Sequence, residues 1–226
     1  MIYYIQYLES NQIIPFVLAY ILAIVVAMSV HEYAHARVAY AFGDDTAYLS
    51  GRLTLNPLAH INMLGFICFL LLGYGWATPV PVNSLKFKNK KYKLGMFCVS
   101  IAGVITNICL AFFLCGIYII TLQKINIGNN TSVMYFLNFF SEVGVSMNIY
   151  LFFFNLIPIP PLDGFNALNS IIKSPVNKVY RFLKNYGFQI FLLIIVVTNI
   201  LGINLLGYLA KFVLGSFLEF WLKVIC

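Results

Sequence analysis

A His-Glu-x-x-His motif at residues 31–35 lies inside an apolar stretch that runs from residue 13 to residue 42. Residues four apart share one face of a helix, so His31 and His35 can present imidazole nitrogens to one tetrahedral Zn²⁺ ion. Glu32 can then reach a water molecule at the ion as a general base, as in zinc hydrolases. An ionisable side chain at membrane depth costs roughly 3 kcal/mol on insertion scales. Three of them within five residues therefore indicate a bound metal rather than a chance match.

The composition predicts the class of protein that must position this motif. Hydrophobic residues make up 62% of the chain and charged residues 9%, whereas soluble domains are about half apolar and a quarter charged. We therefore expect an all-α polytopic membrane protein in contact with the lipid bilayer, with about five to six transmembrane or re-entrant helices. The 226 residues leave no room for a separate soluble domain, so residues 1–226 are predicted to form a single transmembrane domain.

The positive charge is concentrated in two segments, residues 86–93 and 173–184. The positive-inside rule predicts that both are cytoplasmic. Residues 94–121 and 143–162 would then cross the membrane outward and back, joined by a polar loop around Asn129. The last residues, from about 207, either cross again or lie along the interface. So apolar a chain is not expected to bind nucleic acid despite its net charge of +7.

The region that follows the first helix is predicted to be irregular. Residues 46–55 are rich in β-forming side chains around Ser50-Gly51, which predicts a small β-hairpin that ends at Asn56-Pro57. The next apolar run, residues 61–74, is short for a membrane span. It is either re-entrant, as two flanking cytoplasmic segments would require, or a single short span.

Two histidines need at least one more protein ligand to hold zinc, and Asp163 is the best candidate. It follows three prolines between residues 158 and 161, which forbid regular helix, and it precedes Gly164, which permits a tight turn. Unwound backbone at membrane depth is tolerated only when it is buried in protein or lines a water-filled cavity, and a hydrolytic site needs such a cavity. Asn155 interrupts the apolar run before the prolines. Its amide is expected to be a hydrogen-bond partner at the site, with helix packing as the alternative.

The two motifs together, at residues 31–35 and 155–164, resemble those of the site-2 proteases, a family of intramembrane zinc metalloproteases, over most of the chain. The second motif reads Asn-x-x-Pro-x-x-x-Leu-Asp-Gly. Two weaker similarities, at residues 51–60 and 79–83, point to the compact bacterial members that lack PDZ and CBS domains. The resemblance thus implies a multi-pass protein of a prokaryotic plasma membrane.

The resemblance also implies a role for each matching residue. Glu32 would be the catalytic base, Asn155 an accessory group near the substrate or the oxyanion, and one Zn²⁺ per chain would be held by His31, His35 and Asp163. The family's Gly-Pro-x-x-Asn pattern appears here as residues 103–107 without the proline. This departure leaves the zinc ligands intact, but it puts the local kink at Gly103 in doubt. Asn107, which closes the pattern, is expected to be a further accessory residue.

His60 is the remaining histidine of the chain. As a fourth ligand it would close the metal site and exclude water, which is typical of structural zinc. We therefore expect it to support a ligand or to contact substrate, with a plain role in the loop as the alternative.

The predicted function is an intramembrane zinc endopeptidase that hydrolyses peptide bonds in or near the transmembrane segments of other membrane proteins. The substrate helix must be unwound before attack, and the edge of the predicted hairpin offers a place to hold it extended by strand addition. The alternatives are a non-proteolytic membrane protein that binds or transports metal, and a different membrane zinc peptidase. The latter would use a glutamate from a later helix as third ligand, for which only Glu142 and Glu219 are available.

Overall fold

The structure is a computed structural model that describes residues 5–72, 75–88, 91–128, 131–171, 178–200 and 205–225. These residues are predominantly helical, which confirms the predicted all-α class. Short 3₁₀ segments lie at Pro57–Ala59 and Ser84–Lys86. The α-helices are α2 (Ser10–Ala41), α3 (Thr46–Leu49), α4 (Met63–Leu72), α5 (Tyr92–Asn126), α6 (Ser132–Leu156), α7 (Asp163–Ile171), α8 (Lys178–Ile200) and α9 (Leu205–Ile225).

Three of the described helices, α2, α5 and α6, are long and apolar enough to cross a membrane. This agrees with the prediction of a polytopic membrane protein. The predicted total of about five to six membrane segments is not supported. In the described part of the chain, only these three helices have the length and the apolar composition that crossing a membrane requires. Residues 129 and 130, in the predicted polar loop, and residues 173–177, at the start of the second basic segment, lie outside the described residues.

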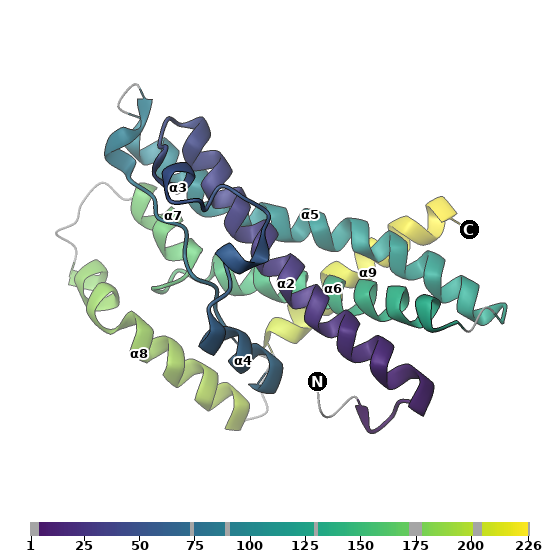
Figure 1. Cartoon of the computed structure of the whole chain (residues 1–226). Coiled ribbons are helices and arrows are strands. Elements are labelled where there is room, and N and C mark those ends of the chain that lie inside the picture. The colour runs from purple at the N-terminus through teal and green to yellow at the C-terminus, as the bar shows by residue number, and fades with distance from the viewer. Residues whose placement is uncertain are drawn as a thin grey trace.

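Small side chains allow α2, α5 and α6 to pack closely against one another (Figure 1). On α2, Ala19, Ala23, Ala27 and Ala36 are all buried with at most 1% of their surface exposed. In a membrane, helices associate through such close van der Waals contact because lipid is as apolar as the side chains. The resulting three-helix core includes the His-Glu-x-x-His turn of α2.

The C-terminal residues form helix α9, which packs along α5 and α6 (Figure 1). The Trp221 indole donates a hydrogen bond to the Phe112 carbonyl oxygen at 2.8 Å. The ring lies against Gly116, where a Cβ atom would approach it to 2.9 Å. The last segment therefore belongs to the packed helical body.

The β-hairpin predicted for residues 46–55 is wrong. Thr46–Leu49 form one turn of helix, α3, and residues 50–55 form turns and bends. The Asp44 carboxylate accepts hydrogen bonds from the Thr46 backbone N–H and hydroxyl, which favours a helical start at this point. The backbone N–H of Arg52 then donates to the Ala47 carbonyl oxygen. Backbone groups of this segment thus form hydrogen bonds with one another instead of with a partner strand.

The two ends of the segment that contains α4 lie next to each other. Ile61 and Ala77 form an isolated antiparallel bridge, and the Thr78 N–H donates to the His60 carbonyl oxygen at 2.8 Å. The returning chain also touches the start of α4, since a Cβ atom on Gly65 would lie 2.1 Å from the Trp76 carbonyl oxygen. A transmembrane span would separate its ends by the membrane thickness. The observed pairing instead holds the residues that flank this segment next to each other.

Candidate metal centre

His31 and His35 lie one turn apart on the buried face of α2. Their Nε2 atoms are 3.0 Å from each other. Helix α5 lies against both rings at Gly103, where a Cβ atom would lie 2.5 Å from His35 Nε2 and from His31 Cε1. The family's proline is missing here, and α5 runs through this position as one continuous helix. Glycine at 103 therefore provides the space that both imidazoles occupy.

Asp163 reaches the histidines from the break between α6 and α7. Helix α6 ends at Leu156, the proline-containing residues follow, and α7 begins at Asp163 itself. One carboxylate oxygen, Oδ2, lies 3.2 Å from Nε2 of His31 and 3.2 Å from Nε2 of His35. Gly164 permits this path, because a Cβ atom there would lie 2.3 Å from the Leu156 carbonyl oxygen. The fold thus joins two distant sequence segments in one cluster.

The Nδ1 atom of each imidazole faces away from Asp163, and its hydrogen-bond partner determines the tautomer of the ring. His31 Nδ1 lies 2.6 Å from Asn107 Oδ1, and His35 Nδ1 lies 2.7 Å from the Val99 carbonyl oxygen. Both partners are acceptors, so each Nδ1 carries the proton and donates it. Each Nε2 therefore points toward Asp163 with a lone pair.

These three acceptor atoms fit a zinc ion. Zinc bonds of about 2.0–2.1 Å in tetrahedral geometry place neighbouring ligand atoms about 3.3 Å apart, close to the observed 3.0 to 3.2 Å. Among the described residues, Asp163 Oδ2 is buried and has no hydrogen-bond donor. Three lone pairs this close together repel each other unless a proton or a metal cation lies between them. Two imidazoles and one carboxylate also leave the fourth position open, as catalytic zinc sites do.

Glu32 is buried beside this cluster, with 9% of its surface exposed. Its Oε2 atom accepts a hydrogen bond from the Val80 backbone N–H at 3.0 Å. Pro79 and Pro81, which flank Val80, carry no N–H group. Residues 79–81 therefore offer a single backbone donor, the Val80 N–H, and Glu32 accepts from it.

Residues 77–83, here called the strap, are held in place by side chains that the sequence did not single out for this role. The Arg52 guanidinium donates to the carbonyl oxygens of Thr78 and Pro79. Asp44, which is completely buried, accepts a hydrogen bond from the Asn83 N–H at 2.6 Å. The strap is thereby tied on both sides of Val80.

Among the predicted accessory residues, Asn107 contacts the cluster directly through His31. Asn155 lies in the last turn of α6 and is partly buried. In the described part of the chain it shares no hydrogen bond with either histidine or with Asp163. Its role near substrate stays a prediction.

His60 lies outside the metal cluster. It is completely buried, and its Nε2 atom lies 2.8 Å from the Thr54 carbonyl oxygen. Its own carbonyl oxygen accepts from Thr78 at the start of the strap. These contacts favour the alternative interpretation, in which His60 helps to pack the loop.

Two further features are separate from the metal cluster. Neither glutamate considered as a third ligand reaches it: Glu142 lies on α6, and Glu219 pairs with Lys223 on α9.

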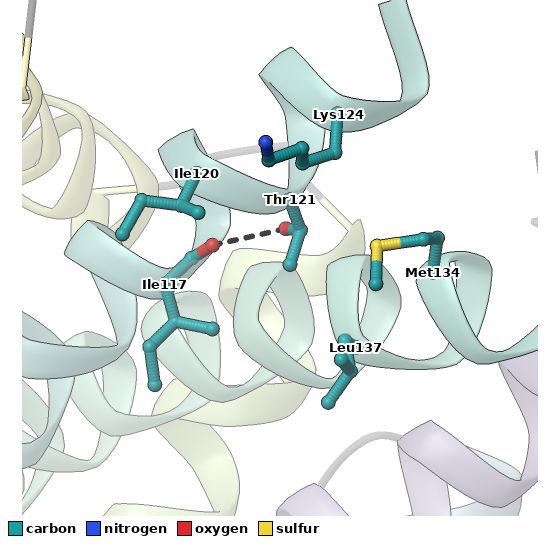
Figure 2. Close-up of a pocket in the computed structure, with 6 residues that line it drawn as sticks. All are labelled: Ile117, Ile120, Thr121, Lys124, Met134 and Leu137. Atoms are coloured by element: carbon teal, nitrogen blue, oxygen red, sulfur yellow. Dashed lines mark hydrogen bonds between the residues drawn. The ribbon is translucent and has the colours of Figure 1, made fainter. Parts of the chain in front are cut away.

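The cavity in Figure 2, of about 450 Å³, lies between α5 and α6 and is lined by Ile117, Ile120, Thr121, Lys124, Met134 and Leu137. It contains none of the residues of the cluster.

Comparison with known proteins identifies the family of the chain. The model of peptidase family M50 matches residues 119–198. The protein named "Putative zinc metalloprotease YwhC" from Bacillus subtilis is 40% identical over 177 residues, which cover 78% of this chain and 79% of the relative. The chain belongs to peptidase family M50, the site-2 proteases. The resemblance inferred from the two motifs is thereby confirmed.

More distant relatives carry similar names. "Putative zinc metalloprotease Rip2" from Mycolicibacterium smegmatis is 26% identical over 178 residues, 75% of this chain and 63% of the relative. "Putative zinc metalloprotease MJ0611" from Methanocaldococcus jannaschii is 31% identical over 138 residues, 61% and 62% of the two chains. No solved structure matches this member of the M50 family.

Proposed function

We propose that the chain is an intramembrane zinc endopeptidase that cleaves peptide bonds in or near transmembrane segments of other membrane proteins. One observation carries the proposal: Asp163 converges with His31 and His35 of α2, a helix that also carries Glu32 and is apolar enough to cross a membrane. Residues 1–226 act as a single transmembrane metalloprotease domain that holds one Zn²⁺. Membership of family M50 supports the same activity.

The chemistry follows from the position of each group. When bound, Zn²⁺ polarises the scissile carbonyl and makes a water molecule acidic near neutral pH. Glu32 takes the proton of that water and later delivers it to the leaving amine. The Val80 N–H engages Oε2, which orients the carboxylate and leaves Oε1 for the proton. Burial of the cluster keeps bulk water away from its charges.

The substrate we propose is an apolar helix that unwinds locally before cleavage, because helical hydrogen bonds protect its peptide carbonyls. The hairpin edge predicted to hold the extended substrate is not formed. The backbone of the strap instead contacts Glu32 through the Val80 N–H. The partner of this chain is therefore a membrane protein that can present an unwound segment next to Glu32.

We propose that the metal centre lies toward the cytoplasmic side of a prokaryotic plasma membrane. The first basic segment lies at the end of α2 that follows the histidines, where the Lys88 N–H bonds to the Phe42 carbonyl and Lys86 pairs with Asp45. Positive loops favour the cytoplasm. Labels at Lys88 and Lys178 should report the cytoplasm and a label at Asn129 the opposite side. A label at Asn129 on the same side as Lys88 would contradict this topology.

Metal content and cleavage, measured on the same purified protein, test the proposed function. We expect about one zinc per chain and metal-dependent cleavage of a reconstituted model protein with a single apolar span. Asp163→Ala should lose both the zinc and the cleavage, and Glu32→Gln should lose only the cleavage. A metal transporter would instead move zinc across proteoliposomes and tolerate Glu32→Gln. Stoichiometric zinc in Asp163→Ala would rule out this ligand set.

A further inference from the structure

A chain of buried amides connects His31 to helix α6. Asn107 on α5 accepts at Oδ1 from His31 Nδ1 at 2.6 Å and donates through Nδ2 to Asn148 Oδ1, also at 2.6 Å. Asn148 in turn donates through Nδ2 to the Gly144 carbonyl oxygen at 2.8 Å. Both asparagines expose only 1% of their surface. Asn148 belongs to neither motif of the sequence, and the proposed chemistry does not use it.

The donor and acceptor of each hydrogen bond in this series can be assigned by starting from the Gly144 carbonyl. A backbone carbonyl can only accept, so the Asn148 amide nitrogen must face Gly144 and its oxygen must face Asn107. That oxygen requires the amide nitrogen of Asn107, which turns the Asn107 oxygen toward His31. His31 Nδ1 must then carry the proton, and Nε2 keeps the lone pair that faces His35 and Asp163.

We infer that Asn148 is a positioning residue that acts through Asn107 to hold His31 in its metal-binding tautomer. Without Asn148, the Asn107 amide is free to turn over and to present its nitrogen to His31. Nδ1 then becomes the acceptor and Nε2 takes the proton, which removes one of the three lone pairs from the cluster. His35 does not need such a device, because the Val99 backbone carbonyl accepts from its Nδ1 directly.

This inference rests on the proposed zinc site, and zinc affinity measured by chelator competition tests it without reference to proteolysis. Asn148→Leu should weaken zinc binding about tenfold or more, the effect typical of groups that orient a metal-binding histidine. Asn138 provides the matched control, since it is a buried asparagine on the same helix and donates across to Thr121 on α5 at 3.2 Å. Asn138→Leu loses a similar interhelical bond and should keep the zinc affinity. Equal affinities in the two variants overturn the inference.

A second background separates orientation from packing. Asp at position 107 can only accept, so it needs no partner to face His31 correctly. In the Asn107→Asp protein, Asn148 Oδ1 faces a carboxylate oxygen that cannot donate to it, so Asn148→Leu should weaken zinc affinity by less than about threefold, against tenfold or more in the wild type. The same loss in both backgrounds would show that Asn148 acts through packing alone.

Two further outcomes keep the inference distinct from the proposed function. If Asn148→Leu does not fold, Asn148→Ala, which removes the same amide without adding bulk, takes its place with Asn138→Ala as its control, and equal affinities in that pair overturn the relay. If His31→Ala keeps full zinc, the proposed ligand set fails. If His31→Ala loses zinc and Asn148→Leu does not, only the relay fails.

Discussion

His31, His35 and their partners lie where α2, α5 and α6 pack face to face, whereas Glu32, the neighbour of His31, is held by an irregular loop. In the helical half, small residues such as Gly103 and buried amides such as Asn107 determine the geometry. In the loop half, the geometry is determined by the Val80 N–H, which lies between two prolines, and by the Arg52 guanidinium. The proposed ligands and the proposed base therefore depend on different kinds of contact.

This difference implies that the two halves can be disturbed separately. A change in the helical half should act first on the affinity for zinc, because it moves a ligand atom. A change in the loop half should act on turnover while the metal stays bound. Zinc content and cleavage rate, measured side by side, report the two halves independently.

The largest effect is expected at Asp163, the proposed third ligand, which lies beside His31 and His35. Asp163→Asn removes the anionic ligand and should weaken zinc binding by about 100-fold or more while nearly eliminating cleavage. Asp163→Glu, longer by one methylene, should bind zinc with distorted geometry and turn over slowly. An aspartate with only a turn-forming role would tolerate Asn, which also favours turns. Normal zinc content in Asp163→Asn would therefore contradict the assignment.

Glu32→Gln should reduce cleavage by about 10² to 10⁴-fold, because an amide cannot accept a proton from water. Zinc content should stay at the wild-type level, since Glu32 is not among the clustered ligand atoms. The glutamine oxygen can still accept from Val80, so the strap should keep its position. The measurement is cleavage of the model substrate together with metal analysis of the same sample. Near wild-type cleavage would place the base elsewhere.

Gly103→Ala tests the helical half alone. The added Cβ would lie 2.5 Å from both His31 and His35, so the imidazoles or the helices must shift, at a cost of about 1–3 kcal/mol. We expect zinc affinity to fall by about tenfold or more, measured by chelator competition. Gly215→Ala on α9 is the matched control, because a Cβ atom there meets nothing within 4 Å. Equal zinc affinity in both alanine variants would show that the close approach at Gly103 is dispensable.

Arg52→Lys tests the loop half. A lysine ammonium cannot reproduce the planar fork that donates to Thr78 and Pro79, so the strap should loosen around Val80. Removing a positioning contact of this kind should lower the cleavage rate by about tenfold with zinc content unchanged. Loss of zinc in Arg52→Lys would break the separation between the two halves.

The smallest effect is expected at the exposed pair between Asp45 and Lys86, whose charged atoms are 2.5 Å apart. The hydrogen bond from Lys86 lowers the pKa of Asp45 below its ordinary value of 3.8. A carboxyl whose pKa is lower in the folded state stabilises the fold above the unfolded pKa, and this contribution disappears as pH falls through the folded pKa. Asp45→Asn should thus lower the Tm of zinc-free protein slightly at pH 7, and this difference should shrink as the pH falls below 3.8 and the Asp45 carboxyl of the wild type becomes protonated. An equal Tm difference at both pH values would show that the charge is not responsible.

Part of this description was predictable because it depends on short-range spacing and on composition. His31 and His35 share a helix face because they are four residues apart. The prolines before Asp163 interrupt a helix wherever they occur in a fold. The apolar composition required a membrane protein whatever the order of its helices. These properties follow from the chain itself.

The hairpin prediction failed because β-forming residues need a partner strand, and the sequence does not show whether one is present. The buried Asp44 side chain instead starts a helical turn at Thr46. His60 was ambiguous for a similar reason. Only the fold shows that it packs against Thr54 in the loop.

By itself the sequence determined the protein class, the family and the residue types of a zinc-hydrolase site, because these depend on composition and on local periodicity. Only the tertiary structure decided which distant groups meet. It brought the Val80 N–H to Glu32, Arg52 to the strap, and Asn148 through Asn107 to His31. These contacts depend on how helices and loops pack across the chain, and no spacing within one segment encodes them.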